Sequence, residues 1–466
     1  MGGFVRATHH ISSALGLAAL LALLTAAAPL LIAQAPDGTA APEALAGKLA
    51  DGSNYRVVKP AQWNGTLVLD LDFANNLSAP PSVVERWMTA NGYAIGGISR
   101  EPVSYRLMQA VDDLLDVRAR FIAKWGATPT RTLTTGNSRG SFVSRIAMEK
   151  RPDVFLGALL SSGGGAGAVA MHNAKLDGTW TLKHLAGVRL QLVGFASQAE
   201  ATAENDRIQT VVKELRATPL GRARLALAAA FEQMPTWTDG DQPPGAGDYD
   251  AQLDQIADAF AGAQAAGVRY GVERVAGGVY SWNHGVDYAD LLAKSGLSPL
   301  VKALYQKAGA DLQADLRTLA AAPRISAAPA AVAAAEQGTS YTGKISGPVI
   351  NVDNIADPVD ADAYKLAYQQ TVTRAGKGDL MRLTWVRSAR HSNQSPLERL
   401  AGFTALVERL DTGRWPDTSP EAMNARAQRL RTASSIDLGA ARFTAHTPPA
   451  ILRPWDGFSW GSYRRP

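Results

Sequence analysis

Apolar residues in this chain gather in short runs that are bounded by Gly, Pro, Asn or charged residues. Runs of this kind, too short for a helix, are typical of buried strands. The clearest of them are residues 66–71, 93–98, 132–135, 155–160, 348–352 and 380–386. We expect each of these runs to form a strand.

Longer segments between the runs repeat apolar residues at the interval of a helix. From Ser104 to Trp125, residues such as Leu107 and Leu114 fall on one helical face, and Gly126 follows as a stop signal. The same pattern predicts helices over residues 83–91, 139–150, 361–374 and 396–410.

Strands that alternate with helices favour an α/β fold, with a mostly parallel sheet and helices on both faces. The alternation stops after residue 165 and resumes at residue 347, and the residues between are Ala-rich and helical in pattern. We therefore predict an α/β core with a large helical cap inserted into it. The expected parts are a linker at 36–50, a core at 51–165 and 347–412, the cap at 166–346, and a C-terminal tail at 413–466.

The start of the chain has the pattern of an export signal. Arg6 precedes an apolar run over residues 11–33, which ends in the small-x-small sequence Ala33-Gln34-Ala35. We predict a signal peptide over residues 1–35 and an exported protein, periplasmic or secreted. The run is close to the roughly 20 apolar residues that span a bilayer, so an uncleaved membrane anchor is the alternative.

Composition narrows the function classes. The 466 residues are 46% hydrophobic and 19% charged, which is globular composition. The net charge of +5 is not concentrated in any run of Lys or Arg, so we predict no nucleic-acid partner. The chain has no cysteine, which excludes disulfides, thiolate metal sites and a cysteine nucleophile. It also has no His-Glu-x-x-His motif, and we predict neither a metal nor a cofactor.

One short segment carries the chemistry. Gly136-Asn137-Ser138-Arg139-Gly140 lies between the expected strand at 132–135 and the expected helix at 139–150. A sharp strand-to-helix turn exposes a serine hydroxyl and crowds its neighbours, so glycine is favoured two residues before and after it. An ordinary loop that uses glycine for geometry alone is the alternative, because the chain holds 43 glycines. The flanking strand and helix make Ser138 the candidate nucleophile.

With this segment the chain resembles the serine hydrolases of the α/β-hydrolase fold, over about residues 50–165 and 345–412. The C-terminal half is loosely similar to exported bacterial esterases, including tannase and feruloyl-esterase-like enzymes. In the family the triad runs in the order serine, acid, histidine. The resemblance implies Asp357, after the run at 348–352, as the acid, and His391, after the run at 380–386, as the base. Asp353 and Asp360 are competitors for the acid.

The chain departs from the family pattern at two places. Arg390 stands where many relatives have Gly before the histidine, and Asp70-Leu71-Asp72-Phe73 stands where many have His-Gly. An oxyanion needs backbone donors beside the nucleophile. We expect the N–H of Arg139 to be the first donor, and N–H groups near Asp72 and Phe73 to supply the second.

Three further residues are candidate substrate contacts. Arg100 and Tyr105 follow the expected strand at 93–98, at the carboxyl edge where open α/β sheets bind ligands. Either could hold a substrate carboxylate, and an exposed salt-bridging Arg is the alternative. Trp282 lies in the predicted cap and indicates an apolar substrate surface, although core packing explains it almost as well.

These patterns predict an exported serine hydrolase that cleaves a carboxylic ester, in a small or oligomeric substrate, through an acyl-enzyme on Ser138. His391 is the predicted general base and acid, and Asp357 its orienting partner. A peptidase or amidase on the same fold is the first alternative. A non-catalytic binding protein that kept the fold is the second. The sequence indicates neither the substrate nor the oligomeric state.

Overall fold

A computed structural model of the protein describes residues 41–453. In this part of the chain nine strands form one sheet, in the order β1-β2-β4-β3-β5-β6-β7-β8-β9. Strands β3 to β8 run parallel, β2 and β9 join them antiparallel, and β1 pairs antiparallel with β2. The strands are β1 (Glu43–Lys48), β2 (Asn54–Lys59), β3 (Thr66–Asp70), β4 (Ala94–Ile98), β5 (Arg131–Asn137), β6 (Phe155–Ser161), β7 (Val349–Ala356), β8 (Met381–Ala389) and β9 (Phe443–Thr444).

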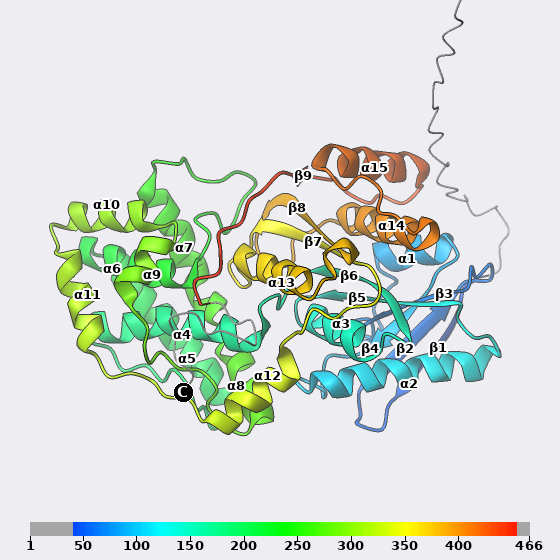
Figure 1. The fold of residues 1–466 in the computed structure, drawn as a ribbon, viewed down its shortest axis with the longest axis horizontal. Coiled ribbons are helices and arrows are strands. Elements are labelled where there is room, and N and C mark those ends of the chain that lie inside the picture. The colour runs from blue at the N-terminus through cyan, green and yellow to red at the C-terminus, as the bar shows by residue number, and fades with distance from the viewer. Residues whose placement is uncertain (1–40, 454–466) are drawn as a thin grey trace, which may run out of the picture. The chain divides into compact units, whose positions relative to one another are not determined.

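Helices cover both faces of this sheet (Figure 1). Helix α14 packs on β6 and β7 and contacts α1, whereas α2 and α3 pack together on the opposite face. The core helices are α1 (Val83–Ala90), α2 (Leu107–Trp125), α3 (Arg139–Lys150), α13 (Asp362–Arg374), α14 (Pro396–Thr412) and α15 (Pro420–Ala433), with a short 3-10 turn at Gly378–Leu380. The predicted α/β-hydrolase fold, a mostly parallel sheet between two helical layers, is confirmed.

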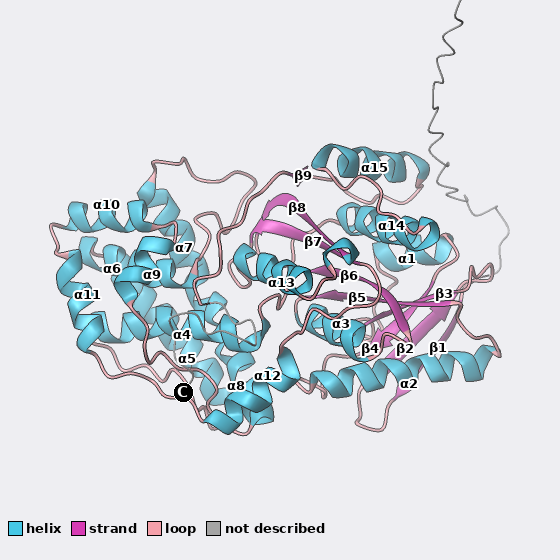
Figure 2. Cartoon of the chain, in the orientation of Figure 1, coloured by secondary structure: helices cyan, strands magenta, loops and turns pink. Residues whose placement is uncertain are grey.

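A second group of helices lies beside the sheet rather than on its faces (Figure 1), and Figure 2 shows no strand among them in the described residues. Residues such as Trp180, Phe231, Phe260 and Leu304 give it a hydrophobic core of its own. These cap helices are α4 (Gly167–Leu185), α5 (Gln198–Arg216), α6 (Pro219–Glu232), α7 (Tyr249–Gln264), α8 (Ala266–Ala276), α9 (Tyr288–Lys294), α10 (Ser298–Ala308), α11 (Leu312–Ala321) and α12 (Pro329–Thr339).

The predicted linker and tail need correction. Residues 43–48, expected within a linker, form β1 and pair along their whole length with β2. The mostly exposed side chains of β1 gave no apolar run to recognise. In the tail, α15 and β9 belong to the core, and the chain then returns to the cap, where Leu452 is buried (Figure 1).

The predicted signal peptide over residues 1–35 lies outside the described residues. Among the residues that are described, no helix is both long and apolar enough to cross a bilayer.

Candidate active site

Ser138 sits at the turn between β5 and α3, with φ 55° and ψ −120°. A positive φ is rare for a residue with a side chain, and such strain costs about 1–3 kcal/mol. The turn places the hydroxyl above the carboxyl edge of the parallel strands, which is the edge where ligands bind in open α/β sheets.

Close backbone approaches explain why the turn needs glycine. A Cβ on Gly136 would lie 2.2 Å from the carbonyl carbon of Gly140, and a Cβ on Gly163 would lie 2.1 Å from the oxygen of Ser138. A Cβ on Gly140 would meet nothing closer than 3.6 Å. The turn therefore requires glycine at 136 and at 163. At Gly140, the second glycine of the sequence motif, the surrounding atoms leave room for a Cβ.

Buried polar groups brace the same turn from below. The hydroxyl of Ser141 lies 2.8 Å from the carbonyl oxygen of Gly136 and 2.6 Å from that of Ser161. Arg145 is fully buried and donates to the carbonyl oxygen of Gly163. These contacts fix the backbone around Ser138, which lets the strained conformation persist.

His391 follows β8 and reaches the serine. Its Nε2 lies 2.9 Å from Oγ of Ser138, and its Nδ1 lies 2.8 Å from Oδ2 and 3.0 Å from Oδ1 of Asp357. The imidazole side chain is 26% exposed, whereas the side chain of Asp357 has no exposed surface. The structure thus brings together the three residues that the sequence predicts as a triad.

Asp357 is the carboxylate that meets the histidine. It follows β7 and accepts the backbone N–H groups of Val359, at 2.9 Å, and of Asp360, at 3.1 Å. Burial acts to raise the pKa of Asp357. The charges of His391 and Lys365 and the hydrogen bonds outweigh it, so the pKa lies below its usual range. This carboxyl is therefore ionised at neutral pH and can orient the imidazole.

The two competing carboxylates have other partners. Asp353 accepts the N–H of Ser162 at 2.5 Å and the side-chain amide of Asn351 at 2.8 Å. Asp360 accepts the N–H of Gly164 at 3.1 Å. Neither is bonded to the histidine, and each instead fixes a segment that follows β6.

The three predicted oxyanion donors differ in the hydrogen bonds that their N–H groups already make. Arg139 is the first residue of α3, so its N–H has no intrahelical acceptor. The prediction for Asp72 needs correction, because its N–H already donates to the carboxylate of Asp70 at 2.8 Å. No hydrogen bond found in residues 41–453 uses the N–H of Phe73, so this group stays a candidate for the second donor. Leu71, which directly precedes Asp72 and Phe73, lies beside Gly140 in α3.

Arg100 is held by Asp72 rather than left open to substrate. Its guanidinium donates to both carboxylate oxygens of Asp72, at 2.7 and 2.6 Å. Asp72 also affects the neighbouring Asp70, because burial and the negative charge of Asp72 raise the pKa of Asp70 to about 6. The salt-bridging alternative for Arg100 is therefore the one that the structure shows.

Tyr105 and Trp282 are packing residues in this structure. Tyr105 is 8% exposed, and the guanidinium of Arg139 lies 4.1 Å from its ring centroid. Trp282 has no exposed surface and belongs to a hydrophobic core. A substrate contact at Trp282 would require it to be uncovered, so its burial corrects that prediction. Arg139 itself donates to the exposed Glu101 at 2.8 Å.

Two buried lysines near the acid were missed by the sequence reasoning. Lys365 of α13 and Lys175 of α4 are 0% and 4% exposed. A single lysine in a helical pattern normally indicates a solvated face, so no local signal marks these two.

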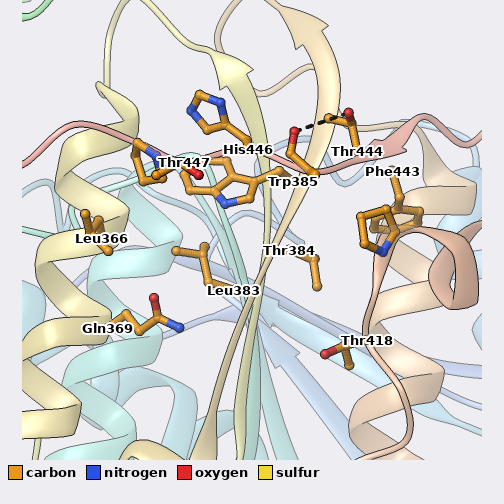
Figure 3. Close-up of a pocket in the computed structure, with 13 residues that line it drawn as sticks. Leu366, Gln369, Leu383, Thr384, Trp385, Thr418, Phe443, Thr444, His446 and Thr447 are labelled. Atoms are coloured by element: carbon orange, nitrogen blue, oxygen red, sulfur yellow. Dashed lines mark hydrogen bonds between the residues drawn. The ribbon is translucent and has the colours of Figure 1, made fainter. Parts of the chain in front are cut away.

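Two cavities lie near the site without containing Ser138 or His391. One, of about 590 Å³, is lined by Asp357, Met234, Trp237 and Leu297. The other, of about 420 Å³, lies between α13, β8 and the tail, and Figure 3 shows Trp385 and His446 in it. Nε2 of His446 is bonded to Asp362, at 2.6 Å, at the wall between the two cavities.

The part of the chain that the structure describes contains no set of side chains arranged as metal ligands. No group of three or more His, Cys, Asp or Glu side chains is placed there to hold an ion. The two titratable members of the triad, His391 and Asp357, are instead paired with each other.

The sheet, the strained serine turn and the hydrogen-bonded Ser-His-Asp chain define a hydrolase of the α/β fold. No family model matches the sequence. The chain is 30% identical over 435 residues to the o-phthalyl amidase of Xanthobacter agilis, covering 86% of this chain and 93% of the relative. It belongs to the family of that amidase.

Solved structures with low sequence identity are also similar to the chain. Feruloyl esterase B from Aspergillus oryzae is 12% identical, with 80% of this chain and 82% of that chain covered and a TM-score of 0.40. An alpha/beta hydrolase fold protein from Chitinophaga pinensis is 11% identical, with 80% and 98% covered and a TM-score of 0.34.

Proposed function

We propose that the protein is a serine hydrolase that cleaves a carboxylic amide or ester through an acyl-enzyme on Ser138. The observation that carries this proposal is the continuous chain of hydrogen bonds from Ser138 through His391 to Asp357. The nucleophile meets its base at 2.9 Å, and the base meets a buried, ionised carboxylate. This is the arrangement that a serine hydroxyl needs in order to attack an acyl carbon at neutral pH.

In the acylation step, Nε2 of His391 takes the proton of the Ser138 hydroxyl as Oγ attacks the carbonyl carbon. The developing oxyanion is held by the N–H groups of Arg139 and Phe73, the first of them strengthened by the N-terminal dipole of α3. The carboxylate of Asp357 stabilises the imidazolium. His391 then gives its proton to the leaving nitrogen or oxygen, and the acyl group stays on Oγ.

In the deacylation step, water replaces the leaving group beside His391. Nε2 takes a proton from this water as the water oxygen attacks the acyl carbon, and the same two N–H groups hold the second oxyanion. Collapse of the intermediate returns the proton to Oγ of Ser138 and releases the acid. The two half-reactions use one base in both directions, so losing His391 blocks both.

The nucleophile is tested with a fluorophosphonate probe, which forms a covalent bond with an activated serine. We expect wild-type protein to label and Ser138→Ala not to label. Equal labelling of the two proteins would show that another residue is the nucleophile. A wild-type protein that does not label, while a known serine hydrolase in the same buffer does, would overturn the proposal.

Between amide and ester, the family relationship favours the amide. The sequence by itself favours an ester, but the relative at 30% identity is named for the cleavage of an o-phthalyl amide. We therefore propose amide hydrolysis as the main activity and ester hydrolysis as a second activity of the same triad. N-methylphthalamic acid and monomethyl phthalate form a matched pair, because each releases phthalate and differs only in the leaving group.

Phthalate release from the two substrates is measured at one pH and corrected for the uncatalysed rate. A higher kcat/KM for the amide, relative to each uncatalysed rate, supports the amidase. Cleavage of the ester alone would restore the esterase reading, and cleavage of amino-acyl anilides in preference to both would favour a peptidase.

We also propose that the protein is exported. The apolar run over residues 11–33 and its small-x-small end support this proposal. Expression of the full chain in a bacterial host, followed by fractionation and N-terminal sequencing, tests it. A chain found in the cytoplasm with its N-terminus intact would contradict export, and an intact chain in the membrane fraction would favour an anchor.

A further inference from the structure

The loop that carries the triad acid is held by two buried lysines from different parts of the fold. We call residues 357–360, which follow β7, the acid loop. Lys365 of α13 donates to the carbonyl oxygen of Asp360, and its Nζ lies 3.1 Å from Oδ2 of the same residue. Lys175, from cap helix α4, donates to the carbonyl oxygen of Val359 at 3.0 Å. Two successive carbonyls of the acid loop are therefore each bound by an ammonium group.

Lys175 acts on the same peptide group that binds Asp357. The carbonyl of Val359 and the N–H of Asp360 belong to one planar peptide unit. Its N–H donates to Oδ1 of Asp357 at 3.1 Å, while its oxygen accepts from Lys175. Turning this peptide would break both bonds at once. A hydrogen-bonded path thus runs from Lys175, through one peptide, to the carboxylate on Nδ1 of His391.

The other contacts of Lys175 anchor it in the cap. It also donates to the carbonyl oxygen of Ala263, near the end of α7, and only 4% of its surface is exposed. Helix α4 itself is buried over nearly all of its length. The cap therefore holds the ammonium in place, through the packing of α4 and the bond to Ala263, while the ammonium binds the acid loop.

The use of a charged donor at this position needs a reason. A buried ammonium is costly, and a neutral amide side chain would satisfy the same carbonyl. Burial lowers the pKa of Lys175, and the charges of Glu232, Asp360 and Asp357 oppose that shift. What the ammonium adds beyond a hydrogen bond is positive charge beside a group of buried carboxylates that includes the triad acid.

Pairing with Glu232 does not account for Lys175 by itself. The carboxylate of Glu232 accepts the side-chain amide of Gln264 at 2.9 and 3.0 Å. Among the ion pairs of the described residues, none joins Glu232 to Lys175. The direct acceptors of the ammonium are the two carbonyls, and one of them belongs to the acid loop.

We propose that Lys175 is a positioning residue that the helical cap contributes to the triad. It orients the peptide between Val359 and Asp360 so that the carboxylate of Asp357 stays on Nδ1 of His391. The inference rests on the proposed function, because Lys175 acts only through that triad. It makes the cap a part of the catalytic apparatus and not only a cover over the substrate.

Lys175→Met, which keeps the length of the side chain but removes the charge and the donor, is the central variant. Its matched control is Lys183→Met, on the same helix, where the lysine donates to the carbonyl oxygen of Leu190 inside the cap at 2.9 Å. Both variants lose a lysine–carbonyl bond, but only the first touches the acid loop. Kinetics on the substrate that wild-type protein cleaves, thermal unfolding and the proton resonance of the His391–Asp357 hydrogen bond are measured for each.

We expect Lys175→Met to lower kcat by about tenfold, since misplacing a catalytic group is costly. KM should stay within about twofold, because no contact to substrate is lost. The acid limb of the kcat/KM profile should move, because the carboxylate that stabilises the imidazolium of His391 is displaced, and the low-field proton resonance should shift or broaden. Lys183→Met should lower the unfolding temperature while leaving kcat, the pH profile and the resonance unchanged. Lys175→Arg should restore part of the lost kcat.

A Lys175→Met protein that loses stability but keeps the wild-type kcat, pH profile and resonance would overturn the inference. If this variant does not fold, Lys175→Leu, which is smaller and also has neither the donor nor the charge, is read in the same way. The proposed function fails separately, when wild-type protein does not label with the fluorophosphonate probe or Ser138→Ala still turns over. If wild-type protein is active and labels, but Lys175→Met leaves kcat, the pH profile and the resonance unchanged, only this inference is disproved.

Discussion

The α-carbon of Gly163 faces the carbonyl of Ser138 so closely that a Cβ would lie 2.1 Å from its oxygen. Gly163→Ala therefore forces the serine backbone to move. Because a shift of about 1 Å at a reacting group can cost a hundredfold in rate, we expect kcat/KM to fall by at least about that factor. Fluorophosphonate labelling rates, measured on protein whose circular dichroism is unchanged, check this outcome.

The control for this prediction is Gly262→Ala. Gly262 lies inside α7, and a Cβ there would meet nothing within 4 Å. Alanine is the better helix former by roughly 1 kcal/mol, so the control should be more stable than wild type and equally active. Gly163→Ala protein that labels as fast as this control would show that the turn tolerates the shift.

Asp357→Asn and His391→Ala should each remove most of the activity while the fold is kept. Asparagine at 357 cannot stabilise the imidazolium and favours the wrong tautomer of His391, and this exchange costs about 10⁴-fold in rate in such triads. The two side chains meet at 2.8 Å, so the double variant should be little worse than either single one. Single-turnover rates with an activated ester check the size of each loss.

Asp353→Asn is the comparison that separates a catalytic carboxylate from a structural one. Asp353 accepts the N–H of Ser162 and has no bond to His391. Its exchange should therefore lower the unfolding temperature clearly while kcat changes little. If Asp357→Asn kept full activity and Asp353→Asn lost it, the acid would have to be reassigned to Asp353.

The triad was accessible to sequence reasoning because each member follows a strand that is visible as a local apolar run. Ser138, Asp357 and His391 come after β5, β7 and β8, and parallel strands bring their carboxyl ends to one edge. The same logic located the sheet, the flanking helices and the large helical insertion. Local pattern and global fold agree over these segments, which is why few tertiary contacts were needed to predict them.

What the sequence could not show depends on contacts between distant residues. The N–H of Asp72 is lost as an oxyanion donor only because the side chain of Asp70 turns back onto it. Lys175 meets Val359 across 184 positions of sequence, and nothing near either residue signals the other. The strand β1 was missed for a related reason, since its mostly exposed side chains form no apolar run and only β2 makes it a strand.

The buried Glu232 should make the stability of the cap depend on pH. Burial is the main reason that the pKa of this carboxyl is raised from 4.5 to about 8. The folded state then holds a proton that the unfolded state releases, so stability is complete below about pH 4.5 and falls as the pH rises towards 8. Glu232→Gln removes this loss, and at pH 8 it should be the more stable protein by on the order of 4 kcal/mol.

Urea unfolding of wild type and Glu232→Gln at pH 5 and pH 8 measures this difference. Glu214→Gln, an exposed glutamate of α5, is the control and should follow wild type at both values. The assignment to Glu232 is wrong if the gap between wild type and Glu232→Gln is the same at the two pH values.

Arg390, which stands directly before His391, adopts φ 72°. Glycine accepts this left-handed backbone without strain, and within residues 41–453 the guanidinium of Arg390 makes only an exposed ion pair, with Asp239. Arg390→Gly should therefore unfold at the same or a higher temperature and keep kcat/KM within about a factor of three. Arg390→Val, whose branched side chain resists positive φ, should instead lower both quantities. If Arg390→Gly were as impaired as Arg390→Val, backbone strain would not be the cause, and the contact between Arg390 and Asp239 would be what holds the histidine loop in place.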